Sequence, residues 1–172
     1  MNQITTTERK VIMRNLHFIN VRTGKHEITD MKVWCLMFPN SLAALQITTS
    51  VLLNLPVAFS AYGSDGDGYI MADDESVNDP FFMAHEEGHL ELGHFGPEST
   101  VMCDEFGVID DVDAEKEADK YAVEKTKDPK HALEALHKFM DRINVSLLSK
   151  EKRVKAAMDI SERMLAISNM NI

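Results

Sequence analysis

The chain has 172 residues, of which 44% are apolar and 7% aromatic, a composition typical of a globular domain. This length can form a complete hydrophobic core, so we expect one domain over residues 1–172. The formal net charge of −10 argues against nucleic acid or an anionic membrane as the main partner.

The cysteines and the absence of long apolar runs indicate in which cellular compartment the protein is located. Cys35 and Cys103 are far apart and form no C-x-x-C pair, which fits a reducing environment. Residues 1–10 contain no apolar signal core, and no apolar run approaches the length of a membrane span. The sequence therefore predicts a cytoplasmic protein that does not interact with a membrane.

The first predicted element is a strand. Val11–Val21 is rich in apolar residues in a pattern that favours a strand over a helix, and Thr23-Gly24-Lys25 is typical of a turn. A short apolar run follows from Met31 to Phe38 and ends at Pro39.

A helix is predicted next over Leu42–Leu55, with Ser41 as its N-terminal cap and Pro56 after its end. Ile47-Thr48-Thr49 is typical of a strand, so a strand stays open as the alternative for this segment. The predicted apolar face of the helix has five members: Leu42, Leu45, Val51, Leu52 and Leu55.

Two short runs, Val57–Tyr62 and Tyr69–Ala72, are predicted to pair as antiparallel strands, because the residues between them are all turn formers. This turn, Gly63–Gly68, also resembles the middle of an EF-hand calcium loop. Such a loop would end on Asp74 instead of a glutamate and would lack its flanking helices. A hairpin turn is therefore the favoured interpretation.

The most informative stretch contains H-E-x-x-H, on a helix whose start is visible in the sequence. Asp79 can cap the free N–H groups, and Pro80 suits the first helical position. The next proline is Pro97, so a helix of about four turns can extend from Pro80 to near Leu92.

Three residues of this motif predict a metal site. His85 and His89 are four residues apart, lie on one helical face and can bind one metal ion together. Glu86 can then act on a water molecule at that ion, as the general base of a zinc peptidase does. The alternative is an ordinary amphipathic helix with two histidines. Apolar residues lead into the motif, however, and buried histidines and a buried glutamate need compensation such as a metal.

A second motif, E-x-x-A-D, follows the long segment Phe95–Val112. Glu115 and Asp119 share a helical face with two alanines, which permit a close approach to another helix. Glu115 would complete a site with three protein ligands and one open position, and Asp119 would accept a hydrogen bond from a ligating histidine. A solvent-exposed acidic helix start is the alternative.

The two motifs together resemble the gluzincin metallopeptidases, and the local sequence is most similar to the ImmA/IrrE-type peptidases, which are frequent in phages and mobile elements. The similarity extends over roughly residues 55–125 and is carried by Phe81 or Phe82 to His89 and by Glu115–Ala122. The helix-turn-helix segment of some relatives is not visible here. A further likeness is that Ser149–Val154 resembles a helix start of HtpX-type peptidases, which have membrane spans.

This resemblance implies an α+β, zincin-like domain with a small sheet, an active-site helix and packed C-terminal helices. It also implies one Zn²⁺ per chain, held by His85, His89 and Glu115, with Glu86 as the general base. Asp119 would accept a hydrogen bond from one of the ligating histidines. The expected partner is a protein substrate such as a repressor. A metal-binding regulatory or anti-repressor protein that acts without turnover stays open as the alternative.

The way in which a substrate binds can also be predicted. A strand directly before the active-site helix borders the cleft in zincin folds, so we expect an extended peptide to pair with an exposed edge at Tyr69, Ile70 and Met71. The acidic run Asp73–Glu75 would favour a basic residue in that peptide. Three residues are open as candidates for the oxyanion donor: Tyr69, Tyr121 and His94. His94 is a poor fourth ligand, because it lies about 140° around an ideal helix from His89.

Residues 129–172 are predicted to form two helices that close the domain. Asp128 and Ser149 are the expected caps. The first helix has an apolar stripe of Leu133, Leu136, Met140 and Ile143. The expected packing residues of the second helix are Val154, Ala157, Met158, Leu165 and Ile167. No special role is expected for His131, His137 or Cys103.

Overall fold

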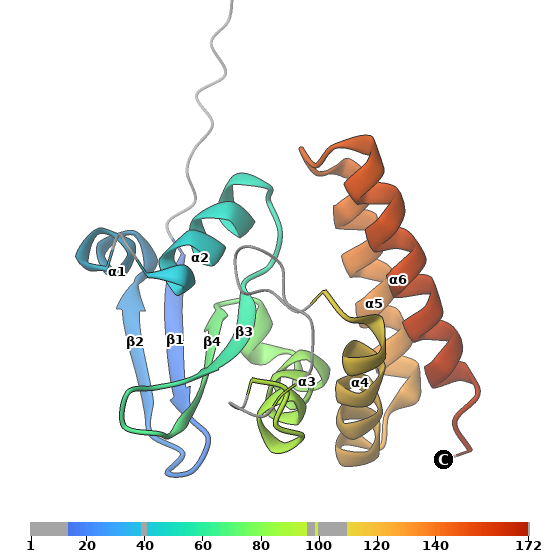
Figure 1. The fold of residues 1–172 in the computed structure, drawn as a ribbon, viewed down its shortest axis with the longest axis horizontal. Helices are drawn as coiled ribbons and strands as arrows, with labels where there is room; N and C mark the ends of the chain where they lie inside the picture. The colour runs from blue at the N-terminus through green and yellow to red at the C-terminus, as the bar shows by residue number, and fades with distance from the viewer. Residues whose placement is uncertain (1–13, 39–40, 96–98, 100–109, 172) are drawn as a thin grey trace, which may run out of the picture.

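A four-stranded antiparallel sheet occupies one side of the molecule and a group of helices the other (Figure 1). The structure is a computed structural model that describes residues 14–38, 41–95, 99 and 110–171. The strands are β1 (Asn15–Asn20), β2 (His26–Asp30), β3 (Ala58–Tyr62) and β4 (Gly68–Asp73). Their order in the sheet is β2-β1-β4-β3. The predicted α+β class is therefore confirmed.

The hairpin of β1 and β2 was predicted only in part. The turn is present, and Gly24 adopts a φ of +69°, which a residue without a side chain accepts readily. Positions 11–13 of the predicted first strand lie outside the described residues. Strand β2 was missed, because its sequence, HEITD, is polar and its side chains are mostly exposed. It lacks the apolar alternation by which a half-buried strand is recognised.

The hairpin of β3 and β4 is confirmed, with Ala58 opposite Ala72 and Tyr62 opposite Gly68. In its turn, the carboxylate of Asp67 accepts hydrogen bonds from Arg22 Nε at 2.6 Å and Arg22 Nη2 at 2.7 Å. Strands flank this turn on both sides, so the EF-hand alternative is wrong.

The prediction that Tyr69, Ile70 and Met71 form an exposed sheet edge is wrong. Strand β4 is an inner strand that pairs with β1 on one side and with β3 on the other, so that Met71 lies opposite both Phe18 and Phe59. The backbone groups of β4 are therefore used within the sheet. The edge strand on this side is β3.

One face of the sheet is covered by α1 (Met31–Met37) and α2 (Leu42–Leu52). The core beneath them is formed by Leu16, Met31, Ile47, Val57 and Met71. The predicted helix and its cap are present, since Ser41 Oγ accepts a hydrogen bond from the backbone N–H of Ala44 at 3.1 Å.

The apolar face predicted for α2 is largely wrong. Leu42, Leu45 and Leu52 are 58%, 42% and 68% exposed, whereas Ala44 and Ile47 are buried. The short helix turns Ile47 towards the sheet, so the leucines of the opposite face lie in solvent. Leucine spacing alone does not say which of two apolar faces meets the sheet.

Helix α3 (Pro80–Glu91) lies against the other face of the sheet, after the short 3-10 helix η1 (Ser76–Asn78). As predicted, the side chain of Asp79 caps it, accepting from the backbone N–H groups of Phe81 and Phe82. Helix α4 (Val112–Thr126) packs closely on α3. Gly88 makes this approach possible, because a Cβ atom there would lie 3.0 Å from Cδ1 of Tyr121.

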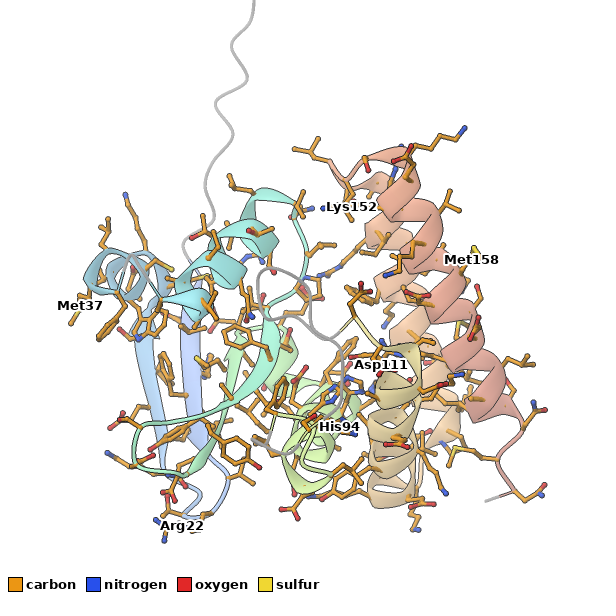
Figure 2. All side chains as sticks on the ribbon, viewed as in Figure 1. Arg22, Met37, His94, Asp111, Lys152 and Met158 are labelled. Atoms are coloured by element: carbon orange, nitrogen blue, oxygen red, sulfur yellow. The ribbon has the colours of Figure 1, made fainter. Side chains whose placement is uncertain are left out.

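The last two helices, α5 (Pro129–Val145) and α6 (Lys150–Ser168), form a pair beside α4 (Figure 1). Both predicted caps are present. Val154, Met158 and Leu165 were expected to pack but are exposed, and Figure 2 shows Met158 directed away from the molecule. The face of α6 that turns inwards instead carries Ile160, Arg163 and Ile167. Among the described helices, none is long and apolar enough to cross a membrane.

Candidate metal centre

Three side chains from two helices meet at one point between α3 and α4. The Nε2 atoms of His85 and His89 lie 3.0 Å apart, and each lies 3.4 Å from a carboxylate oxygen of Glu115. A tetrahedral zinc ion with bonds of about 2.0–2.1 Å holds its ligand atoms about 3.3 Å apart. The three predicted ligands are thus brought together at distances that fit one metal ion.

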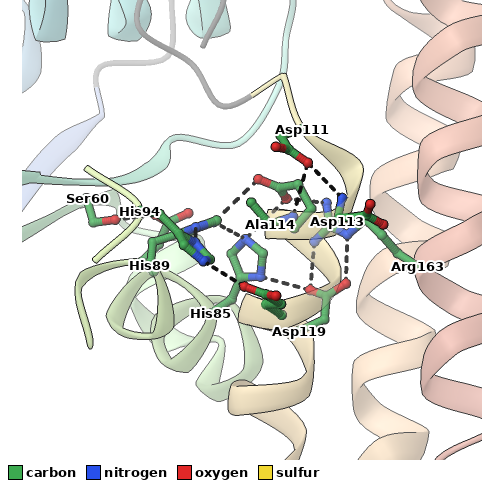
Figure 3. A network of polar contacts seen from close by, with 12 residues as sticks. Ser60, His85, His89, His94, Asp111, Asp113, Ala114, Asp119 and Arg163 are labelled. Atoms are coloured by element: carbon green, nitrogen blue, oxygen red, sulfur yellow. Dashed lines mark hydrogen bonds and ion pairs between the residues drawn. The ribbon is translucent and has the colours of Figure 1, made fainter. Parts of the chain in front are cut away.

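The partner of His85 fixes the orientation of its ring. Nδ1 of His85 lies 2.8 Å from Oδ1 of Asp119, the contact predicted from the sequence (Figure 3). Asp119 also accepts hydrogen bonds from Arg163, so it acts as an acceptor and the Nδ1–H of His85 donates. In this tautomer the Nε2 atom of His85 directs its lone pair towards the metal position.

His89 is held in the same tautomer by a different group. Its Nδ1 lies 2.7 Å from Nδ1 of His94, whose Nε2 lies 3.2 Å from the carboxylate of Glu117. Burial lowers the pKa of His94, which favours a neutral ring. His94 then donates to Glu117 and accepts from His89, leaving the Nε2 lone pair of His89 free for a metal.

The role of His94 was missed because the argument from helical angles assumed that the helix continues. Helix α3 ends at Glu91, and Gly93 has a φ of +72°, a left-handed conformation that reverses the chain. The reversal brings the ring of His94 back against that of His89. The glycine just after the helix was the signal that could have indicated this return.

Arg163 of α6 is the second residue that sequence reasoning missed. Its Nε and Nη2 atoms donate to the two oxygens of Asp119 at 2.7 and 2.8 Å, and its Nη1 atom lies 2.7 Å from Oε2 of Glu115. Its side chain is only 8% exposed. Arg163 lies between Ile160 and Ile167 in the inward stripe of α6, and a charge in such a stripe is the signal that could have found it.

The buried charges around the site do not balance without a cation. Three carboxylates, those of Glu86, Glu115 and Asp119, gather near one guanidinium, that of Arg163, which leaves a net charge of about −2 if all four are ionised. A divalent cation would neutralise this cluster, because uncompensated buried charge is costly.

The effect of this charge is visible in the pKa values of the cluster. Burial disfavours a charged His85, but the negative charges of Glu115 and Asp119 outweigh it and raise the pKa of His85 to about 10. Burial likewise disfavours a charged Glu115, yet Arg163 and His85 hold its pKa well below the usual range. Without a metal, a proton on His85 therefore provides one of the two missing positive charges.

Glu86 lies beside the metal position at the wall of a cleft of about 350 Å³. One of its oxygens, Oε2, accepts a hydrogen bond at 3.0 Å from Oγ of Ser60, which belongs to the edge strand β3. The side chains of His85, His89 and Glu115 line the same cleft. The predicted general base and the three predicted metal ligands thus line one cleft, which is large enough for a bound molecule.

Other predicted roles do not agree with the structure. The hydroxyl of Tyr69 donates to Asp65 at 2.7 Å, and that of Tyr121 donates to Glu87 at 3.1 Å, so both are engaged away from the cleft. The long segment Phe95–Val112 lies outside the described residues, except for its two ends and position 99. Cys103 also lies outside the described residues.

The acidic run Asp73–Glu75 at the end of β4 contacts other residues of the chain. Asp73 is buried and accepts a hydrogen bond from Arg14, and Asp74 contacts His17. Glu75 forms an ion pair with Arg142 of α5. These acids have partners within the chain, and the strand that they follow is not an edge, so the attraction of a basic substrate residue stays a prediction without support from these contacts.

No family model, curated protein or solved structure matches this chain. The likeness to gluzincin peptidases therefore depends on the two sequence motifs, and the metal centre depends on the geometry of His85, His89 and Glu115.

Proposed function

We propose that the chain is a zinc-dependent metallopeptidase. The observation that carries this proposal is the convergence of two Nε2 lone pairs and the Glu115 carboxylate on one point beside Glu86. Three protein ligands leave a fourth position open, which is typical of a catalytic zinc site and not of a structural one.

The chemistry follows from the groups around that point. Zinc in this position would lower the pKa of a water molecule and polarise a carbonyl group. Glu86 would take the proton of the attacking water and deliver it to the leaving amine. Ser60 holds Oε2 of Glu86, so the other oxygen is free to carry the proton. Asp119 and His94 would keep both imidazoles in the tautomer that binds metal.

A protein substrate fits the cleft as an extended segment. Strand β3 pairs with β4 on one side and forms the edge of the described sheet on the other. Its Ser60 contacts Glu86, so a peptide paired with the free side of β3 would pass close to the metal position. This proposal replaces β4 by β3 as the strand that binds substrate.

The first experiment concerns the metal. Elemental analysis of the purified chain after expression with zinc should give about one zinc per chain, in accordance with one set of three ligands. A His85→Ala variant should lose it, whereas Glu86→Gln should retain it because Glu86 is not a ligand. Equal zinc content in the wild type and in His85→Ala would count against the site.

The second experiment separates turnover from binding. Proteins cleaved in a host lysate by the wild type should stay intact with Glu86→Gln, since the variant keeps the metal but lacks the base. If both forms produce the same biological effect and neither cleaves a protein, the peptidase proposal fails. The chain would then be a metal-binding regulatory protein that acts by contact.

A further inference from the structure

The sheet ends at β2, on the side opposite to β3. Among the described strands, β2 pairs with β1 alone, in a continuous antiparallel register from Asn15 opposite Asp30 to Ile19 opposite His26. Its sequence, HEITD, contains no proline or lysine, the residues with which many proteins block an edge strand. A further strand can therefore pair with β2.

The backbone hydrogen bonds of the β1–β2 ladder determine which residues of β2 face outwards. At its two ends, the N–H of Met31 donates to the carbonyl of Arg14 at 3.1 Å, and the N–H of Asn20 donates to that of Lys25 at 2.9 Å. Along an antiparallel ladder, every second pair of residues is joined in this way. The residues between the joined pairs direct their N–H and C=O groups away from β1, and on β2 these are His26, Ile28 and Asp30.

These three outward residues complement themselves in antiparallel order. If two copies of β2 pair about Ile28, His26 lies opposite Asp30 of the second copy. A ring that can carry a positive charge then faces a carboxylate, and two exposed isoleucines face each other, both of which are favourable pairs. Glu27 lies opposite Thr29. Pairing about Glu27 instead would place two carboxylates opposite each other, which is unfavourable.

The side chains at the ends of this pairing are already held in place within one chain. Nε2 of His26 lies 2.8 Å from Nδ1 of His17. Oδ1 of Asp30 accepts a hydrogen bond at 2.9 Å from the backbone N–H of Val33, which leaves Oδ2 for the second copy. Less conformational entropy is lost when such ordered side chains enter an interface.

Apolar surface adjoins the same edge. Helix α1 begins directly after β2, and its Val33, Leu36 and Met37 are half or more exposed. Figure 2 shows Met37 beyond β2, on the outer side of the sheet. A two-fold axis that relates two paired edge strands is perpendicular to the sheet, so α1 of both copies would lie on the same face of the joined sheet. Burial of these side chains there would stabilise the pair.

We propose that the chain forms a two-fold symmetric dimer in which the β2 strands of two copies pair antiparallel about Ile28. Main-chain hydrogen bonds of His26, Ile28 and Asp30 join the two sheets into one. Strand β3 then lies at each outer end of the joined sheet, away from the dimer interface. The dimer does not depend on the proposed function, so either can fail without the other.

Sedimentation measures the association directly. The wild type should change from the mass of one 19.4 kDa chain to twice that mass as its concentration rises to about 0.2 mM, where even a weak dimer is populated. Ile28→Lys should weaken the dimer at least about tenfold, because two like charges then face each other. Val154→Lys introduces the same charge at an exposed position of α6 and should have no effect. A monomer at every concentration, or equal losses in both variants, would overturn the proposal.

Cysteines on β2 test the register. The Cα atoms of a hydrogen-bonded antiparallel pair are about 5.5 Å apart, within the range that a disulfide spans. In a Cys35→Ser, Cys103→Ser background, Ile28→Cys should therefore form a covalent dimer on mild oxidation. Glu27→Cys is the matched control, because its two thiols would belong to a diagonal pair of residues about 7–8 Å apart. A cross-link no more efficient for Ile28→Cys than for Glu27→Cys would contradict this register.

The charge at position 26 provides a third readout. His26→Lys should dimerise at least about tenfold more tightly than His26→Glu, because the first places a cation and the second an anion opposite Asp30 of the second copy. Both variants lose the contact with His17. His137→Lys and His137→Glu make the same changes in net charge at an exposed position of α5 and should dimerise alike. Equal differences at positions 26 and 137 would overturn the pairing of His26 with Asp30.

Discussion

The Nδ1 atoms of the two histidines at the proposed metal position form hydrogen bonds with two different kinds of group. Asp119 is an anion with a buried arginine partner, whereas His94 is a neutral ring that accepts one hydrogen bond. Both arrangements leave Nε2 free, and the negative charges of Glu115 and Asp119 outweigh burial and raise the pKa of His85. The two histidines are therefore expected to respond differently to mutation of the groups behind them.

The contribution of His94 can be measured through zinc affinity. We expect His94→Phe to keep the fold but weaken zinc binding about 10- to 100-fold, because His89 loses the acceptor that orients its ring. Competition with a chromophoric chelator gives the dissociation constant. His137→Phe is the matched control, because His137 is exposed on α5. An affinity equal to that of the wild type would show that His89 needs no such partner.

The raised pKa of His85 predicts proton release on metal binding. In the metal-free chain this pKa is about 10, so at pH 7.5 the imidazole carries a proton that zinc must displace. Glu115 has a lowered pKa and has no proton to lose. Calorimetric titrations in buffers of different ionisation enthalpy should give about one proton released per zinc at pH 7.5, and release should fall as the pH rises through 10. Absence of release at pH 7.5 would contradict the raised pKa.

At the scale of elements, the predictions that depend on local chemistry were the successful ones. The caps at Asp79, Ser41 and Ser149 and the turn at Gly24 are present, because a cap or a turn is determined by residues a few positions apart. The same holds for the ligand spacing of His85 and His89.

The predictions that failed depend on contacts between distant segments. Strand β4 is an inner strand because β1, some fifty positions earlier in the sequence, pairs with it, as in the pair Phe18 and Met71. The buried face of α6 is decided by Arg163, which must reach Asp119 on α4. Periodicity within one segment contains neither kind of information.

The proposed metal centre requires close contact between α3 and α4, because its ligands come from both helices. Gly88→Val should displace Tyr121, and with it α4, so that Glu115 and Asp119 move away from the histidines. We expect zinc affinity to fall at least about tenfold, as when partners of ligands are lost. Glu91→Val places the same side chain at an exposed position of α3 and should have little effect on zinc binding. Equal affinities in the two variants would show that α4 tolerates the displacement.

In the whole molecule, the proposed metal centre lies where residues of the sheet and of three helices meet. Helix α3 carries two of the proposed ligands, α4 the third, β3 the hydroxyl that holds Glu86, and α6 the arginine that pairs with two carboxylates (Figure 3). The stability of the helical side should therefore depend on the metal. Without a bound metal ion, an excess of negative charge would remain where α4 and α6 meet.

This dependence can be tested with Arg163→Met. The metal-free variant should be destabilised by about 3–5 kcal/mol, because Asp119 and Glu115 lose their buried partner. Zinc should restore more stability to the variant than to the wild type, since the metal then provides the remaining positive charge for Glu115. Urea unfolding with and without zinc measures both quantities. Arg153→Met, at a more accessible position of α6, should change stability by less than about 1 kcal/mol.

The position of Arg163 on the last helix also has a consequence for biosynthesis. Translation releases α3 and α4 before α6, so a nascent chain exposes His85, His89 and Glu115 while their counter-charge is still absent. An ion captured at that stage would be held by three ligands in an open, strongly acidic groove, where exchange with competing metals is easy. Docking of α6 would then enclose whichever ion is present, so metal identity would be determined by supply at the ribosome as well as by the finished site.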